Sequence, residues 1–149
     1  MRSVVAGASV IVSIWILTGC SAMAPNDMGT ASDVQGSDWA LNELVGFNID
    51  TDRRPTLRFK SESQVQGFSG CNSFTGGALV GQNTIEFQDM ILTMRSCRNS
   101  AMEMESSYID ALGKVTSWEI DIHMLRLKNS DGKTLLRYRR MGSSHFGTT

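Results

Sequence analysis

Apolar and polar residues alternate along most of the chain after residue 38, and this alternation predicts a series of short β-strands. The clearest case is residues 56–60, where Leu57 and Phe59 fall on one face and Arg58 on the other. Alternation of this kind is typical of antiparallel strands that have one face buried and the other in water. Comparable patterns predict further strands near residues 39–45, 64–68, 74–80, 84–87, 118–120, 124–128 and 134–138.

Residues 100–115 repeat with the period of a helix instead of a strand. The apolar positions that share one helical face are Ala101, Met104, Tyr108, Leu112 and Val115. Ser100 and Glu103 have the spacing of a capping box, in which the two side chains satisfy first-turn amides. Gly113 suits the end of a helix. We therefore predict one amphipathic helix in the mature chain, beginning near Ser100.

The stretch of residues 67–77 is rich in glycine and contains a cysteine. Glycines within strand-like sequence mark bulges, bends or close approaches of two backbones. We expect a strand, a sharp corner at Cys71-Asn72 and a second strand. A corner of this kind lets a sheet curl. The predicted fold class is α+β, mainly antiparallel β, with a curled or barrel-like sheet of about seven or eight short strands and one amphipathic helix.

The first residues have the features of an export signal. Met1-Arg2 is a positive head, and the apolar run from Val4 to Leu17 is shorter than the ~20 residues that a membrane-spanning helix needs. The segment Leu17-Thr18-Gly19-Cys20 resembles the lipobox of bacterial lipoproteins. The resemblance implies that Cys20 receives diacylglycerol and becomes the first mature residue. Acyl chains on Cys20 would hold the protein permanently on a bilayer.

The same resemblance indicates where the protein goes. Ser21 follows the cysteine in place of the aspartate that usually signals retention at the inner membrane. We therefore expect a lipid-anchored protein of the outer membrane that faces the periplasm. The predicted organisation is a lipoprotein signal peptide at 1–19, a flexible tether at 20–37, one folded domain at 38–140 and a disordered tail at 141–149.

The cysteine count predicts one disulfide bond. The chain has three cysteines, and lipidation of Cys20 leaves Cys71 and Cys97. An even number of remaining cysteines in an exported protein is typical of disulfide pairing. A bond between these two would tie the glycine corner to the start of the helix.

The balance of charges excludes some partners. The formal net charge is −1, which leaves no electrostatic footprint for nucleic acid. The basic residues Arg137, Arg139 and Arg140 fall on the last predicted strand. Charges there are interpreted as protection of an edge strand against pairing with other sheets.

Catalysis and metal binding find little support in the sequence. His123 lies in a strand pattern, His145 lies in the tail, and neither is near a Gly-x-Ser-x-Gly elbow. We expect no enzyme activity and no catalytic residue. The soft metal ligands are Met90, Met94, Cys97, Met102, Met104 and His123. They lack the paired spacing of a metal site, and methionine is a common filler of cores, so we expect no metal and no cofactor.

Four segments together resemble one known family. They are Trp39-x-Leu41, the run Gly67-x-x-Gly70-Cys71-Asn72-x-Phe74-x-Gly76, the segment Thr93-Met94-x-x-Cys97, and the hairpin from Leu125-x-Leu127 to Leu135-Leu136. With them the stretch from Trp39 to Arg139 resembles the META domain, also called the HslJ-like family of heat-inducible lipoproteins. The resemblance implies a fold similar to an antiparallel β-barrel lipoprotein that pilots a type III secretion secretin. It also implies a link to heat response or to tolerance of the antibiotic novobiocin, and it brings no catalytic residue.

Three classes of function are compatible with this reading. We expect a non-catalytic binding or assembly module that is anchored through Cys20 and acts on another envelope protein. The first alternative is a carrier whose curled sheet holds a lipid or a small apolar ligand. The second is a periplasmic metal-binding protein. A continuous apolar cavity would favour the carrier, an exposed apolar patch on a filled barrel the assembly module, and clustered sulfur ligands the metal protein.

Overall fold

The structure is a computed structural model that describes residues 30–61, 63–121 and 123–142. Its elements are α1 (Ala31–Val34), β1 (Asp38–Leu44), β2 (Thr56–Phe59), β3 (Gln64–Phe68), β4 (Ser73–Val80), β5 (Ile85–Leu92), α2 (Asn99–Gly113), β6 (Ser117–Asp121), β7 (Met124–Lys128) and β8 (Thr134–Arg140). The predicted fold class, mainly antiparallel β with one amphipathic helix, is confirmed, and α1 is a short addition to it.

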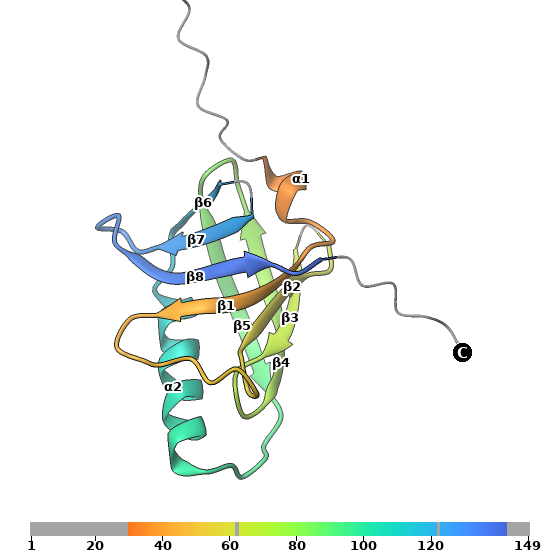
Figure 1. Cartoon of the computed structure of the whole chain (residues 1–149). Helices are drawn as coiled ribbons and strands as arrows, with labels where there is room; N and C mark the ends of the chain where they lie inside the picture. The colour runs from red at the N-terminus through yellow and green to blue at the C-terminus, as the bar shows by residue number, and fades with distance from the viewer. Residues whose placement is uncertain (1–29, 62, 122, 143–149) are drawn as a thin grey trace, which may run out of the picture.

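All strands belong to one curled sheet. Eight strands lie in the order β5-β4-β3-β2-β1-β8-β7-β6, and every neighbouring pair is antiparallel (Figure 1). The two outer strands, β5 and β6, approach each other at one end, where Thr84 and Ser117 form an isolated bridge. The Trp118 amide also donates to the Asn83 carbonyl at 3.0 Å. The sheet is therefore an incomplete barrel whose two edges meet at a single corner.

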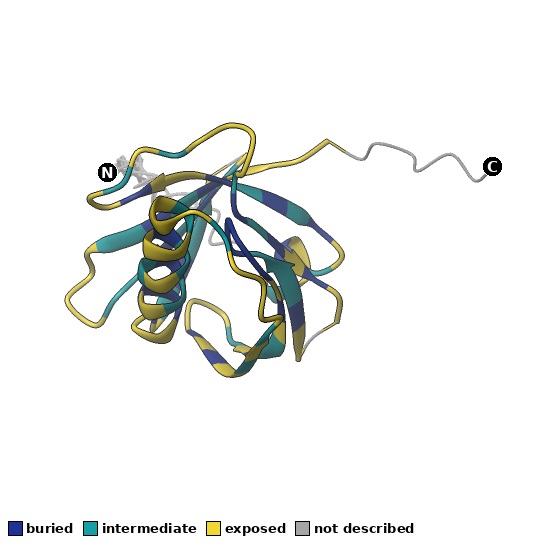
Figure 2. Cartoon of the chain, turned by 90° about the horizontal axis from the view of Figure 1, so that it is seen from below, coloured by how far each residue is buried: buried dark blue, intermediate teal, exposed yellow. Residues whose placement is uncertain are grey.

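Helix α2 connects the two edges of the sheet and packs against it. Its buried side chains are Met104, Tyr108, Ala111 and Leu112. Three of them belong to the predicted apolar stripe, whereas Ala111 does not, and Ala101 of that stripe is half-buried. Figure 2 shows exposed residues along the outer side of the helix. The helix begins at Asn99, one residue before the predicted start, and Arg98 is its N-cap without a side-chain cap hydrogen bond. The predicted capping box at Ser100 is therefore wrong.

Large side chains fill the interior between the sheet and α2. The largest of those with less than 2 % exposure are Trp39, Tyr108, Tyr138, Phe59 and Phe74. The Tyr108 ring lies 5.9 Å from that of Phe74 and 6.5 Å from that of Tyr138 between centroids. Aromatic pairs at such distances stabilise a core beyond the area that they bury. The concave side of the sheet is thus a packed core.

The two tyrosines of the chain offer a test of this packing. The Tyr138 hydroxyl donates to the Tyr108 hydroxyl at 2.9 Å, and burial raises the pKa of both phenols above the ordinary value. The folded state therefore keeps protons that the unfolded state loses, so stability is fully present below pH ~10 and falls as the pH rises further. We expect ultraviolet titration to show no tyrosinate near pH ~10 in the native protein, and both groups ionising there in urea. Ionisation near pH ~10 without urea would contradict the packed core.

The expectation of a flexible tether over residues 20–37 is wrong for residues 31–37. Val34, in α1, is only 1 % exposed, and the Gly36 amide donates to the Phe59 carbonyl at 2.9 Å. The Trp39 indole donates to the Ser37 hydroxyl at 2.7 Å. The buried side chain of Val34 and the hydrogen bonds of Gly36 and Ser37 thus hold this segment on the sheet. Residues 1–29, with the predicted signal peptide, Cys20 and the rest of the tether, lie outside the described residues, as do 143–149 of the predicted tail.

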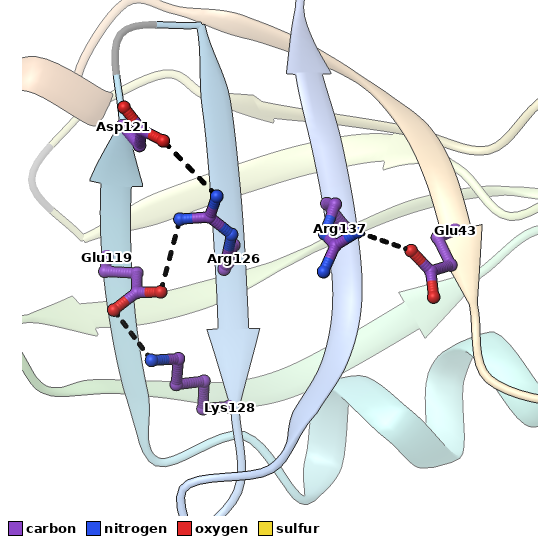
Figure 3. A network of polar contacts seen from close by, with 6 residues as sticks. All are labelled: Glu43, Glu119, Asp121, Arg126, Lys128 and Arg137. Atoms are coloured by element: carbon purple, nitrogen blue, oxygen red, sulfur yellow. Dashed lines mark hydrogen bonds and ion pairs between the residues drawn. The ribbon is translucent and has the colours of Figure 1, made fainter.

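The outer face of the sheet carries ordered ion pairs (Figure 3). Arg126 lies 3.3 Å from both Glu119 and Asp121, and Lys128 lies 2.7 Å from Glu119. The hydrogen bond from Lys128 is the main reason that the pKa of Glu119 is lowered. Strand β8 lies between β1 and β7, so the interpretation of its arginines as protection of an edge is wrong.

Two arginines of β8, Arg137 and Arg140, instead contact neighbouring elements. Arg137 pairs with Glu43 of β1 at 2.9 Å. Arg140 donates to the Asp33 carbonyl at 2.6 Å and lies 4.9 Å from the centre of the Trp39 ring. These contacts hold β8 to β1 and hold α1 to the sheet.

Candidate functional site

The glycine corner predicted from the sequence is the tight turn between β3 and β4. Phe68 and Ser73 pair across it, and Gly70 has a φ of 101°, which side chains other than glycine rarely allow. Gly67 is needed for a different reason, because a Cβ atom there would lie 2.0 Å from the Thr56 carbonyl oxygen. The glycines therefore allow the turn and bring β3 close to the core.

Asn72, at the end of this turn, holds three segments together. Its side-chain oxygen accepts from the Arg95 amide at 2.7 Å and from the Thr93 hydroxyl at 2.9 Å, both in the loop between β5 and α2. Its side-chain amide donates to Glu105 of α2 at 2.9 Å. Asn72 is only 4 % exposed. We call Ser69, Asn72, Thr93, Arg95 and Glu105 the turn–helix junction.

Glu105 supplies the helical side of the junction. Its carboxylate accepts from the Asn72 backbone amide at 2.8 Å, from the Asn72 side-chain amide, and from the hydroxyl of Ser69, which is fully buried. Glu105 was not among the residues predicted from the sequence. The only signal was its place beside the apolar helical face, between Met104 and Tyr108.

The predicted cysteine pair lies at the same place. Cys71 of the turn and Cys97 of the loop before α2 have their sulfur atoms 2.09 Å apart and their Cα atoms 5.9 Å apart, within bonding distance. Cys71 is 3 % exposed, whereas Cys97 is partly exposed. The bridge therefore connects the same turn and loop that Asn72 connects by hydrogen bonds.

A hollow of about 290 Å³ lies next to the junction, between the β1–β2 loop and the start of α2. Residues that line it include Phe47, Asp50, Arg53, Gly70, Arg98 and Glu103. A guanidinium nitrogen of Arg53 lies 3.7 Å from the Cys97 sulfur. The hollow thus adjoins the more exposed end of the bridge.

The contacts of the turn–helix junction indicate a structural role and not a catalytic one. The Ser69 hydroxyl is buried against Glu105 and the Asn72 carbonyl, so it has no access to a substrate.

His123 lies in an exposed turn between β6 and β7 and not in a strand as expected. Among residues 30–61, 63–121 and 123–142, no cluster of three or more His, Cys, Asp or Glu side chains could hold a metal ion. Of the soft ligands named in the sequence, Met94 is fully exposed and Met104 is buried.

A family model described as META domain matches residues 32–142. The chain belongs to the META domain family. The match includes the whole turn–helix junction and both cysteines of the bridge. It also begins within α1, so the META domain here starts before the predicted boundary at residue 38.

Two solved structures share the fold of this META domain. A protein from Burkholderia xenovorans has a TM-score of 0.65 and 19 % identity, and the match covers 87 % of this chain and 99 % of the other. A second structure, also determined by NMR, has a TM-score of 0.62 and 21 % identity, with 75 % of this chain and 95 % of the other covered. At these identities the likeness concerns the fold alone. No curated protein matches the chain significantly.

None of the helices in the described part of the chain combines the length and apolar character required to cross a membrane.

Proposed function

We propose that this META-domain protein is a lipid-anchored, non-catalytic binding or assembly module of the bacterial envelope. Cys20 carries the anchor in the outer membrane, and the domain faces the periplasm and contacts another envelope protein. The contact contributes to tolerance of stress or of antibiotics such as novobiocin. The resemblance to the lipobox and the membership of the META domain family support this proposal.

The observation that carries the binding role is the packed interior of the curled sheet. A carrier needs an internal space of several hundred Å³. Trp39, Phe59 and Tyr138 occupy that space here, each with at most 1 % exposure. A partner would therefore meet the outer surface of the domain.

That surface carries exposed apolar side chains near the junction. Ile91, at the end of β5, is 71 % exposed, and Met94, three residues further along the chain, is 100 % exposed. Single apolar residues on a surface are common, but Ile91 lies just before, and Met94 lies within, the loop that the disulfide and Asn72 hold in place. An ordered loop that presents apolar side chains loses little conformational entropy on binding.

The folded domain stays close to the proposed anchor. Residues 21–29 are all that separate Cys20 from the start of the described chain at Thr30. A fully extended chain covers at most about 3.6 Å per residue, so the domain lies within about 40 Å of the membrane surface. This short reach favours a partner that is itself in or near the outer membrane.

The anchor is tested by replacing the cysteine. We expect wild-type protein, expressed in its own host, to fractionate with the outer membrane and Cys20→Ala to lose that association, because no acyl chain can be attached. The Cys20→Ala variant should also fail to restore heat or novobiocin tolerance to a deletion strain. Ser21→Ala is the matched control and should behave as wild type. Unchanged fractionation of Cys20→Ala would overturn the proposed anchor.

A further inference from the structure

We propose that the bridge between Cys71 and Cys97 is a site of thiol–disulfide exchange, at which a low-molecular-weight thiol attacks Cys97 and releases Cys71. This inference goes beyond the proposed envelope function and does not depend on it. It rests on the different surroundings of the two sulfur atoms.

Access distinguishes the two sulfurs. Cys71 is 3 % exposed beneath the turn, whereas Cys97 is partly exposed in the loop before α2. Exchange begins with a thiolate that approaches one sulfur along the S–S axis, so the accessible sulfur is the one attacked. An incoming thiol therefore bonds to Cys97.

Each sulfur also has a hydrogen-bond donor within reach. The side-chain amide of Asn72 lies 3.4 Å from the Cys71 sulfur, and a guanidinium nitrogen of Arg53 lies 3.7 Å from the Cys97 sulfur. A disulfide sulfur is a weak acceptor, but a thiolate is charged and accepts strongly. Asn72 thus stabilises the thiolate that leaves, because it already points at Cys71 before the bond breaks.

The charges around Cys97 favour an anionic thiol. Arg53 contacts the sulfur, and Arg98 is the next residue and the N-cap of α2, whose N-terminus carries partial positive charge. Asp50 and Glu103 line the same hollow, so the hollow carries charges of both signs. A full positive charge, that of Arg53, lies 3.7 Å from the attacked sulfur.

The exchange step is balanced with one thiol as the co-reactant. The thiolate sulfur attacks the Cys97 sulfur and forms a mixed disulfide, while the Cys71–Cys97 bond breaks and its electron pair stays on Cys71. Cys71 leaves as a thiolate and can take a proton from water. The step is reversible, because Cys71 can attack Cys97 again and expel the small thiol. While the bridge is open, the loop of residues 93–98 keeps the hydrogen bonds that Asn72 makes with Thr93 and Arg95, and those between Thr93 and Ser73.

The test uses the purified full chain and two small thiols of opposite charge, 2-mercaptoethanesulfonate and cysteamine. Opening of the bridge is followed over time, Cys71 is trapped with N-ethylmaleimide as it is released, and peptide mass spectrometry locates the small thiol. Peptide mapping keeps Cys20 separate from the other two cysteines. The variant is Arg53→Ala, and the control is Arg139→Ala, which removes an exposed arginine from β8.

We expect the small thiol on Cys97 at least about tenfold more often than on Cys71. The rate ratio of the anionic to the cationic thiol should fall at least about threefold in Arg53→Ala, because a unit charge roughly 6 Å from the sulfonate or ammonium group of the attacking thiol changes a rate by about this factor in water. The ratio should be unchanged in Arg139→Ala. Comparing ratios between proteins cancels the intrinsic difference between the thiols.

Three results would each overturn the proposal. They are attachment of the thiol mainly to Cys71, an identical rate ratio in wild type and Arg53→Ala, and a bridge that neither thiol opens. None of them bears on the anchor at Cys20 or on a protein partner, so failure here is distinct from failure of the proposed function.

Discussion

Replacing Asn72 with alanine is expected to lower the free energy of unfolding by about 4 kcal/mol. The substitution removes the acceptor of the Arg95 amide and of the Thr93 hydroxyl, and the donor to Glu105. Thr93 and Arg95 are themselves exposed, so each of these two bonds contributes about 0.5–1.5 kcal/mol, and the bond to the charged Glu105 contributes about 1.5–3 kcal/mol. The half-buried Glu105 carboxylate keeps its bonds from the backbone amide of residue 72 and from the Ser69 hydroxyl.

Urea unfolding, followed by tryptophan fluorescence, measures this loss. Asn83→Ala is the matched control, because Asn83 is exposed in a turn where only its backbone carbonyl is used. We expect that control to change stability by less than about 0.5 kcal/mol. A loss below about 1 kcal/mol for Asn72→Ala would show that the turn–helix junction does not hold the domain together.

Removing both cysteines of the bridge is expected to have an effect of similar size. The two residues are separated by 26 positions, and the chain-entropy model gives about 3.5 kcal/mol for a closed loop of this length. The double variant Cys71→Ala with Cys97→Ala should therefore unfold at a clearly lower urea concentration than oxidised wild type. Wild type under reducing conditions should resemble the variant.

Thiol counting supplies the control for this second prediction. In urea without reductant, neither Cys71 nor Cys97 of wild type should react with a thiol reagent, and both should react once a reductant is added. Two reactive thiols in the untreated protein would mean that the bridge is absent, and equal stability of variant and wild type would mean that it contributes nothing.

The parts of the fold that follow strict periodicity could be predicted from the sequence. Strand β2 was found because Leu57 and Phe59 alternate with charged residues, and α2 because its apolar stripe recurs every three or four positions. The spacing of apolar residues shows which face of a strand or helix is buried, so these elements can be predicted without knowledge of the tertiary structure.

Other elements could not be predicted because tertiary contacts define them. Strand β5 was expected to end near residue 87 but runs to Leu92, since a bulge with positive φ at Asp89 reverses the alternation. Segment 31–37 has a single apolar anchor, Val34, which carries no periodic signal. Contacts between residues far apart in the sequence determine both the length of β5 and the position of segment 31–37.

The candidate site shows the same division. The glycine motif and the pairing of Cys71 with Cys97 could be proposed from residue types and from the cysteine count. Glu105 could not, because a glutamate beside an apolar stripe is normally solvated, and only the folded chain brings it to the Asn72 amide. Buried polar partners are specified by geometry, which one sequence does not reveal.

The most direct test of the central claim, that this META domain binds an envelope protein through its outer surface, is photo-crosslinking from Met94 in the intact envelope. A photoreactive amino acid replaces Met94 in the lipidated full-length protein, and Lys133, in the exposed β7–β8 turn, is the matched control position. We predict a protein adduct of one discrete mass from position 94 that is absent from position 133 and is lost with Cys20→Ala. Adducts with lipid or small molecules alone, or no adduct specific to position 94, would contradict the account.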